Sequence, residues 1–392
     1  MLAEGITFPS RPLRLLLAVD SLEVGGAERH VVDLALALRR KGHEVEVTCS
    51  VSGELCEPLE TARVPVWPLT RRLVKRRASL SYARGIRKLL GERTFDLVHA
   101  HIFASAVAAA IATLGKSVPL VITEHTEASW QTWLTRPVSR WAHRRAKRVI
   151  AVSTPIERRL IEHYGVPSHL VTLIPNAVTP ASDEPPDPPV ALRGVWLEHP
   201  LIGVVARLQP EKGVANFLKA AVRVAEVSSQ ARFLVVGDGP LRGELLDLAE
   251  HLGLSERVRF LGYRSDSRAL MELMDVLVVP SLTEGSPLIV LEAMAAGVPL
   301  VASAVGGIPD QVRHGREGIL VPPDDPDALG EALGVLLRDP AYARRLGEAG
   351  RRRTQNEFSH ETLVRRTEGV YRAAIGWKAH QDPEIAEIPS AM

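Results

Sequence analysis

The chain has 392 residues, which is enough for two domains of ordinary size. Hydrophobic residues make up 46% of it and charged residues 24%, proportions that are typical of a folded globular protein and exclude a mostly disordered one. The 48 Lys and Arg nearly balance the 46 Asp and Glu. A dedicated nucleic-acid-binding protein usually carries a clear basic excess, so we expect no nucleic-acid partner.

The cysteines and the apolar stretches indicate a compartment. Cys49 and Cys56 cannot form a disulfide scaffold and favour a reducing environment. The least polar stretch, residues 104–114, is too short to cross a bilayer, and Glu4 together with a short apolar core argues against a signal peptide. We therefore expect a cytoplasmic protein, with at most peripheral contact to the inner face of the cell membrane.

Short β-rich runs alternate with amphipathic segments through the first half. The predicted strands are residues 13–19, 44–50, 97–101, 120–123 and 148–153, and residues 27–41 have helical spacing. This alternation predicts an α/β fold with parallel sheets and helices on both faces.

Residues 179–199 interrupt that rhythm with five prolines in the first eleven positions, so we expect a linker there. The alternation restarts with predicted strands at residues 201–206, 232–236, 258–261, 276–279 and 300–302, and residues 326–378 are predicted helical with a break at Pro340. We predict an N-terminal domain over 1–180, a linker over 181–199, a second domain over 200–358, and a final helix and tail over 359–392.

The strongest local motif runs from Glu284 to Pro299. A helix is predicted to begin near Pro287, where proline suits the first turn and where the free N–H groups and the helix dipole favour an anion. A carboxylate beside such a site, Glu284 or Glu292, can accept hydrogen bonds from sugar hydroxyls. The plainer interpretation is one charge favoured by the helix dipole and one solvated residue.

A second motif, Arg207-Leu-Gln-Pro-Glu-Lys212-Gly213, follows a predicted strand. Ligands of open α/β sheets bind beyond the carboxyl ends of strands, and two cations there could clamp a diphosphate. Two solvated surface charges are the alternative.

Two glycine turns also follow predicted strands. Gly25-Gly26 would let the backbone approach a phosphate closely, or is a plain turn. Gly237-Asp-Gly239 is similar to a dinucleotide-binding fingerprint, but its third glycine, Gly243, comes one position late.

Histidines end two predicted strands. We expect His99 and His101 to point to opposite faces of their strand, with one of them buried, and His125 to face a ligand. A metal site would need a third ligand that the sequence does not place, so none is predicted. Asp325-Pro-Asp327 is interpreted as a turn and helix cap rather than a metal site.

Taken together, these segments resemble the family-4 glycosyltransferases, which are retaining enzymes of the GT-B fold. The order of the motifs matches that of the family from near residue 14 to about residue 360. The matching residues are Gly25–Glu28, His125, Ser153, Ile174–Asn176, Arg207, Lys212, Gly237–Pro240 and Glu284–Glu292.

The resemblance implies two Rossmann-like domains facing across a cleft, with the nucleotide-sugar donor mainly on the C-terminal half and a glycan, lipid-linked or small-molecule acceptor mainly on the N-terminal half. The final helix would cross back to the N-terminal domain. It implies a catalytic set of His125 near the transferred sugar, Arg207 and Lys212 on the leaving diphosphate, and Glu284 on the sugar. The donor-binding set would be Gly25, Gly26, Gly239, Tyr263, Arg264, Gly285, Ser286, Pro287, Leu288 and Glu292.

The implied activity is transfer of a sugar from a nucleotide-diphosphate sugar with retention of configuration, in cell-surface glycan, polysaccharide or glycolipid synthesis. Within that set Glu292 would hold the ribose, the backbone of Gly26 the phosphates, and Tyr263 would lie beside the base. No metal and no other cofactor is expected, because two cations and a helix N-terminus can stabilise the leaving group.

The sequence departs from the family in two places. Pro175-Asn-Ala-Val-Thr179 replaces a common Pro-Asn-Gly-Val-Asp, and Thr126 follows His125 where an acidic residue is common. Two alternatives stay open, namely a GT-B sugar-nucleotide epimerase or hydrolase and a non-catalytic nucleotide-sugar-binding protein. An NAD oxidoreductase would rest only on the incomplete glycine run.

Basic residues gather at two places in the N-terminal half, the second interleaved with Trp130, Trp133 and Trp141. They are Arg71, Arg72, Lys75, Arg76, Arg77, Arg136, Arg140, Arg144, Arg145, Lys147 and Arg148. This pattern suits an anionic membrane surface or a lipid-phosphate acceptor. The alternative is a solvated helix whose tryptophans belong to the core.

Overall fold

The computed structural model describes residues 12–74, 78–126, 132–133, 135–180, 192 and 194–376. Tertiary contacts divide them into two compact units. The first comprises the described chain up to Val152, Glu157–Ile174 and the residues from Leu363 onward; the second comprises Ser153–Ile156 and Pro175–Thr362.

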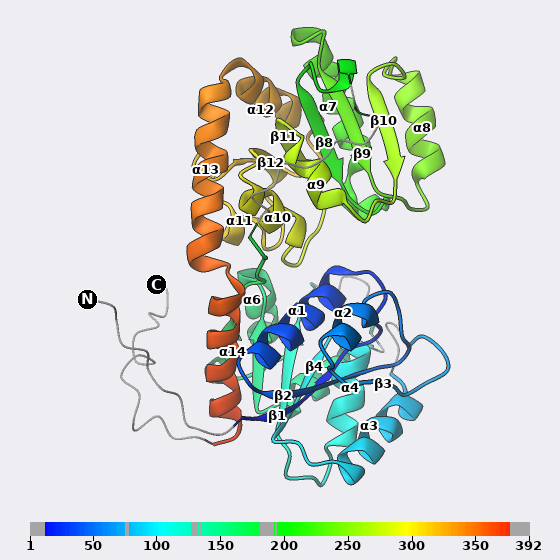
Figure 1. Ribbon diagram of the computed structural model, residues 1–392, viewed down its shortest axis with the longest axis vertical. Helices are drawn as coiled ribbons and strands as arrows, with labels where there is room; N and C mark the ends of the chain where they lie inside the picture. The colour runs from blue at the N-terminus through cyan, green and yellow to red at the C-terminus, as the bar shows by residue number, and fades with distance from the viewer. Residues whose placement is uncertain are drawn as a thin grey trace, which may run out of the picture. The chain divides into compact units, whose positions relative to one another are not determined.

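Within the described residues, the first unit holds a seven-stranded parallel sheet of order β3-β2-β1-β4-β5-β6-β7 (Figure 1). The elements of this part of the chain are β1 Arg14–Ala18, α1 Gly26–Arg40, β2 Glu44–Cys49, α2 Cys56–Thr61, β3 Val66–Pro68, α3 Leu80–Glu92, β4 Leu97–His101, α4 Phe103–Ala112, β5 Leu120–Glu124, α5 Thr135–Arg145, β6 Arg148–Ala151, α6 Thr154–Glu162 and β7 Val171–Leu173.

The described part of the second unit holds a six-stranded parallel sheet of order β10-β9-β8-β11-β12-β13. The elements that follow along the chain are β8 Leu201–Val205, α7 Val214–Val227, β9 Arg232–Val236, α8 Arg242–His251, β10 Val258–Gly262, α9 Ser267–Glu272, β11 Val276–Val279, α10 Leu288–Ala296, β12 Leu300–Ser303, α11 Ile308–Gln311, β13 Ile319–Val321, α12 Pro326–Arg338, α13 Pro340–Glu357 and α14 His360–Ala374.

The predicted α/β fold is therefore confirmed, with two parallel, Rossmann-like sheets. Each predicted strand is present, with ends within two residues of the prediction. Sequence patterns missed β3, β7 and β13. Each of these strands has three residues and lies at the edge of its sheet, where a pattern of alternating side chains is too short to detect.

The second sheet is covered on both faces, which explains its continuous apolar strands. Val276 and Val278 of β11 belong to one core cluster, while Leu277 and Val279 belong to the other. Successive side chains of a strand point to opposite faces, so an unbroken run of Val and Leu fills both layers. None of the helices in the described part of the chain has the length and apolar character of a membrane span.

Aspartates begin the C-terminal helices. Asp325 accepts a hydrogen bond from the N–H of Ala328 at 2.9 Å, which confirms the predicted cap. Asp339 likewise accepts a hydrogen bond from the N–H of Tyr342 at 2.9 Å. Pro340, which was predicted as a break, is therefore the first residue of a new helix. The segment 181–191, which contains most of the predicted linker, lies outside the described residues.

One glycine positions the loop after β8. Gly213 has φ 61°, and a Cβ at that position would lie 2.0 Å from the carbonyl oxygen of Pro280, which follows β11. Gly253 has φ 69° but would meet nothing within 4 Å. The two residues share a left-handed backbone and differ in how closely another segment approaches.

We expect Gly253→Ala to lower the free energy of unfolding by about 1–2 kcal/mol, the usual cost of a left-handed backbone for a residue with a Cβ. Gly213→Ala should cost at least about 1 kcal/mol more, because the loop after β11 must also move. Urea unfolding of both variants measures the difference. Equal losses of unfolding free energy would show that the close approach of the two backbones at Gly213 does not affect stability.

Candidate functional site

The candidate site of the second unit lies where the strand order reverses. Strand β8 pairs with β9 on one side and β11 on the other. Open α/β sheets bind ligands beyond the carboxyl ends of the strands at such a point. Every donor-site residue that was predicted in this unit follows β8, β9, β10 or β11, or lies in α10.

Lys212 and Glu284 form the central contact of this site. The Nζ of Lys212 lies 2.7 Å from Oε1 of Glu284, which also accepts a hydrogen bond from the Ser281 hydroxyl at 2.7 Å. The side chain of Glu284 is 9% exposed and that of Lys212 is 27% exposed. Arg207, from the same loop as Lys212, is exposed. The structure thus brings two of the predicted residues, one of each charge, into direct contact.

Backbone contacts hold the Glu284 loop from two sides. The N–H of Leu282 donates to the carbonyl of Glu211 at 2.9 Å, which joins the loops after β11 and β8. On the other side the N–H of Gly307 donates to the carbonyl of Gly285 at 2.9 Å, and a Cβ at Gly306 would lie 1.7 Å from the carbonyl oxygen of Glu284. Gly306 and Gly307 were not among the predicted site residues, although two adjacent glycines are a signal that the sequence shows.

Side-chain amides fix the residues before α10. Asn176 donates from Nδ2 to the carbonyl of Ser286 at 2.7 Å. Gln311 donates from Nε2 to the Ser286 hydroxyl at 3.0 Å and to the Pro287 carbonyl at 3.2 Å. Pro287, the N-cap of α10, supplies no side-chain hydrogen bond to the helix, which begins at Leu288, so its first N–H groups are suited to an anion. The Asn of the altered Pro-Asn loop therefore has a positioning contact, and Gln311 was missed because only the fold brings it here.

The glycines after β9 serve close packing. A Cβ at Gly237 would lie 1.9 Å from the carbonyl oxygen of Ala206, and one at Gly239 would lie 2.4 Å from that of Leu208. These close backbone contacts account for both glycines after β9, so a dinucleotide-binding role is not needed to explain them. At the adjacent end of β10, Tyr263 is 58% exposed and Arg264 pairs with Asp266 at 2.6 Å. Glu292 is half-buried in the second turn of α10.

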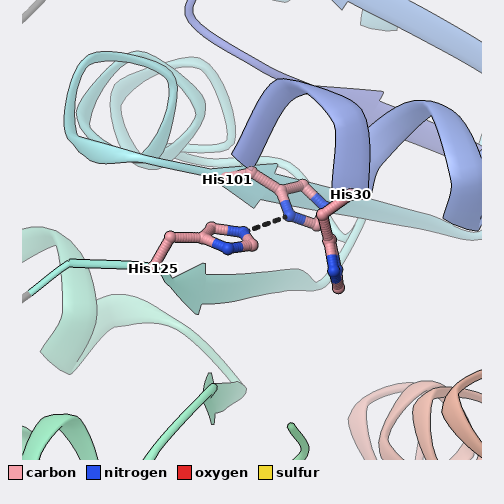
Figure 2. A group of neighbouring side chains, drawn as sticks. All are labelled: His30, His101 and His125. Carbon is pink, nitrogen blue, oxygen red and sulfur yellow. Dashed lines mark hydrogen bonds between the residues drawn. The ribbon is translucent and has the colours of Figure 1, made fainter. Parts of the chain in front are cut away.

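The remaining predicted residues, Gly25, Gly26 and His125, belong to the first unit. Gly25 is the N-cap of α1 and supplies no side-chain cap of its own, and Gly26 is the first residue of the helix. His125 follows β5 and is buried. It lies in a group of three imidazoles with His30 of α1 and His101 of β4, which Figure 2 shows.

The prediction that His99 and His101 point to opposite faces was wrong. Both side chains are fully buried and their ring centroids lie 4.0 Å apart. Residues two apart on a strand share a face, since the side-chain period is two. His99 shares hydrogen bonds with Thr123 and with Tyr371 of α14, each at 2.7 Å.

Burial sets the charge states at this edge of the first sheet. It lowers the pKa values of His99, His101 and His125 well below the ordinary histidine value, so these rings are neutral at pH 7. Asp20, which follows β1, is fully buried and accepts hydrogen bonds from the N–H and the hydroxyl of Ser105. Burial outweighs those bonds and raises the pKa of Asp20 to about 7.

Comparison with known proteins identifies the class. Residues 195–353 match the family described as glycosyl transferases group 1, and residues 24–182 match glycosyltransferase family 4. Alpha-maltose-1-phosphate synthase of Mycolicibacterium smegmatis is 30% identical over 375 residues, which cover 89% of this chain and 95% of that one. Glycogen synthase of Mycobacterium tuberculosis is 29% identical over 406 residues, covering 94% and 96%.

Among solved structures, HepE of Anabaena in complex with UDP-glucose matches with a TM-score of 0.79 and 25% identity, covering 91% of this chain and 98% of that one. The chain therefore belongs to the group 1 glycosyl transferases. It is a glycosyltransferase with the GT-B fold.

The buried Asp20 should make stability depend on pH. Its carboxyl stays protonated in the folded chain up to about pH 7, whereas in the unfolded chain it ionises near 3.8. Between these values the folded state binds more protons, so stability falls as the pH rises. Asp20→Asn should reduce the loss of unfolding free energy between about pH 5 and about pH 8 by about 2 kcal/mol.

Denaturant unfolding at the two pH values tests this expectation. Asp247→Asn, an exposed carboxylate on α8, is the matched control and should leave the pH dependence unchanged. If Asp20→Asn and the unmodified protein lose the same stability over this range, Asp20 is ionised in the folded chain.

Proposed function

We propose that this chain is a retaining glycosyltransferase that moves a sugar from UDP to an acceptor hydroxyl, in the synthesis of a cell-surface glycan, polysaccharide or glycolipid. The observation that carries the proposal is the Lys212–Glu284 pair at the strand-order reversal of the second sheet. The choice of UDP is supported by the structures of HepE in complex with UDP and with UDP-glucose.

The leaving diphosphate is the group to stabilise, because negative charge develops on it as the sugar departs. Lys212 carries three N–H donors and uses one on Glu284, so it can bind a phosphate oxygen without leaving that partner. Arg207 and the uncapped N–H groups of α10 supply further donors. We assign the diphosphate to these groups and no metal to this step.

The other groups bind the rest of the donor. Glu284 and the backbone of residues 285–288 bind the transferred sugar, and Glu292 binds the ribose hydroxyls. Tyr263, an exposed aromatic ring beside Arg264, stacks on the base. His125 of the first unit contacts the transferred sugar, and that unit binds the acceptor. The acceptor proton passes to the leaving phosphate, so the mechanism needs no dedicated protein base.

Removal of Lys212 tests the diphosphate assignment. Lys212→Ala should lower kcat about 100-fold or more, since deleting one transition-state donor commonly costs that much. Lys219→Ala changes an exposed lysine of α7 and should leave kcat unaltered. Unchanged turnover in Lys212→Ala, with an unchanged melting temperature, would contradict the assignment.

Three further measurements separate this function from the epimerase, hydrolase and binding-protein alternatives. UDP should raise the melting temperature more than GDP or ADP, because a ligand that binds only the native state stabilises it. NMR of the product should show the donor's anomeric configuration. Release of free sugar at full rate without acceptor would favour a hydrolase or epimerase, and UDP binding without turnover would favour a binding protein.

A membrane role is proposed from the surface of α5. Arg136, Arg140 and Arg144 are exposed at spacings of four residues and therefore share one side of the helix. Trp133 is 79% exposed and Trp141 is 39% exposed, so these two tryptophans are not core residues. Trp130 and residues 75–77 of the basic clusters lie outside the described residues. We infer that this surface binds anionic lipid head groups.

Vesicles that contain phosphatidylserine should retain the protein at low salt and release it as the ionic strength rises, because screening weakens the attraction. The double variant R140E/R144E should lose this binding. The control R344E/R345E reverses the charge of two exposed arginines of α13, and this variant should still bind the vesicles. Failure of the unmodified protein to bind such vesicles at low salt would refute a membrane role.

A further inference from the structure

Three buried histidines from separate elements converge in the first unit. His30 comes from the second turn of α1, His101 from the last position of β4, and His125 from the residue after β5 (Figure 2). One nitrogen of each ring lies within 4.8 Å of the other two. The proposed transfer reaction uses only His125 of this group, so the convergence of the other two rings has no role in it.

The spacing of the rings matches a three-imidazole metal site. Zinc binds histidine nitrogen at about 2.0–2.1 Å with tetrahedral angles, which places the ligand nitrogens about 3.4 Å apart and the ring centroids about 5 Å apart. The observed centroid separations are 4.8 Å for His30–His125, 5.3 Å for His101–His125 and 5.6 Å for His30–His101. The three rings therefore stand at the separations that one shared ion requires.

A second observation points to a ligand. Nε2 of His101 is buried and has no hydrogen-bond partner among the described residues. The neighbouring His99 contrasts with it, since both of its ring nitrogens are hydrogen-bonded. A buried polar atom normally has a partner, and an unpaired one requires an explanation. Hydrogen bonding within the cluster alone does not explain the unpaired nitrogen.

The chemistry of the donor set selects the kind of ion. Neutral imidazole is the form of histidine that binds metals. Nitrogen ligands without a carboxylate suit zinc, nickel or copper and not magnesium or calcium, which prefer oxygen. With the ring protons of His101 and His125 both on Nδ1, each ring offers the lone pair of Nε2 to the ion and stays neutral, and the ion takes the place of the His101–His125 hydrogen bond.

We propose that His30, His101 and His125 bind one transition-metal ion of the zinc class, with a fourth coordination position left for water. The sequence did not predict this site because the third ligand lies on α1, far along the chain from the two strand ends. A consequence rests on the proposed function: an ion held by His125 prevents that ring from contacting the sugar, so zinc should inhibit transfer.

Calorimetric titration of the tag-free full chain with Zn²⁺ tests the site directly. We expect one ion per chain, and His30→Gln and His125→Gln should each weaken binding at least about tenfold, the lower limit seen even for changes outside the ligand shell. His163→Gln removes an exposed histidine and is the matched control, which should bind as the unmodified protein does. Co²⁺ should give the absorption spectrum of a four-coordinate site in the unmodified protein and not in His30→Gln.

The outcomes separate the metal site from its consequence. Absence of stoichiometric binding, or equal binding by His30→Gln, His125→Gln and the unmodified protein, would overturn the site. Circular dichroism shows whether the variants are folded, and a rise in melting temperature of the unmodified protein with Zn²⁺ tests binding without any variant. Stoichiometric binding without inhibition would support the site and contradict the role of His125 in transfer. Inhibition that is lost in His30→Gln would support both.

Discussion

The candidate donor site depends on one close contact between two backbones. Gly213 lies against the carbonyl of Pro280 at a distance that no Cβ would permit. That contact brings the loop after β8 onto the loop after β11 and sets Lys212 beside Glu284. Gly306 and Gly307 pack against the opposite side of the Glu284 loop in the same way. These glycine contacts set the distance between the two loops that carry the charged pair.

The first unit uses burial rather than close backbone contact. Its sheet ends in polar side chains, among them Asp20, His101 and His125, that are withdrawn from water. Withdrawal disfavours the charged forms, so the carboxyl is protonated up to about pH 7 and the rings are neutral. The two units therefore present different chemistry at the same edge of the same kind of sheet. One offers charges of both signs, and the other offers neutral hydrogen-bonding and metal-binding groups.

Much of the second unit could be predicted from its sequence. Parallel strands end at one edge, so any residue that directly follows a predicted strand is expected there, and this rule sufficed for Arg207, Lys212 and Glu284. Edge strands of three residues were missed because they carry too few side chains to show a period. His99 and His101 were misplaced because the period of two was applied wrongly, and the correct rule puts both on one face.

The sequence by itself determined the alternation of strands and helices, the chain positions of the functional motifs, and the family. These are local properties, since apolar periodicity, proline, glycine and short motifs act over a few residues. Only the tertiary structure decided that Gln311 and Asn176 hold the residues before α10, and that His30 joins His101 and His125. Those contacts join residues far apart in the chain, and packing of α1 and α11 against their sheets, rather than any local pattern, sets the distance between them.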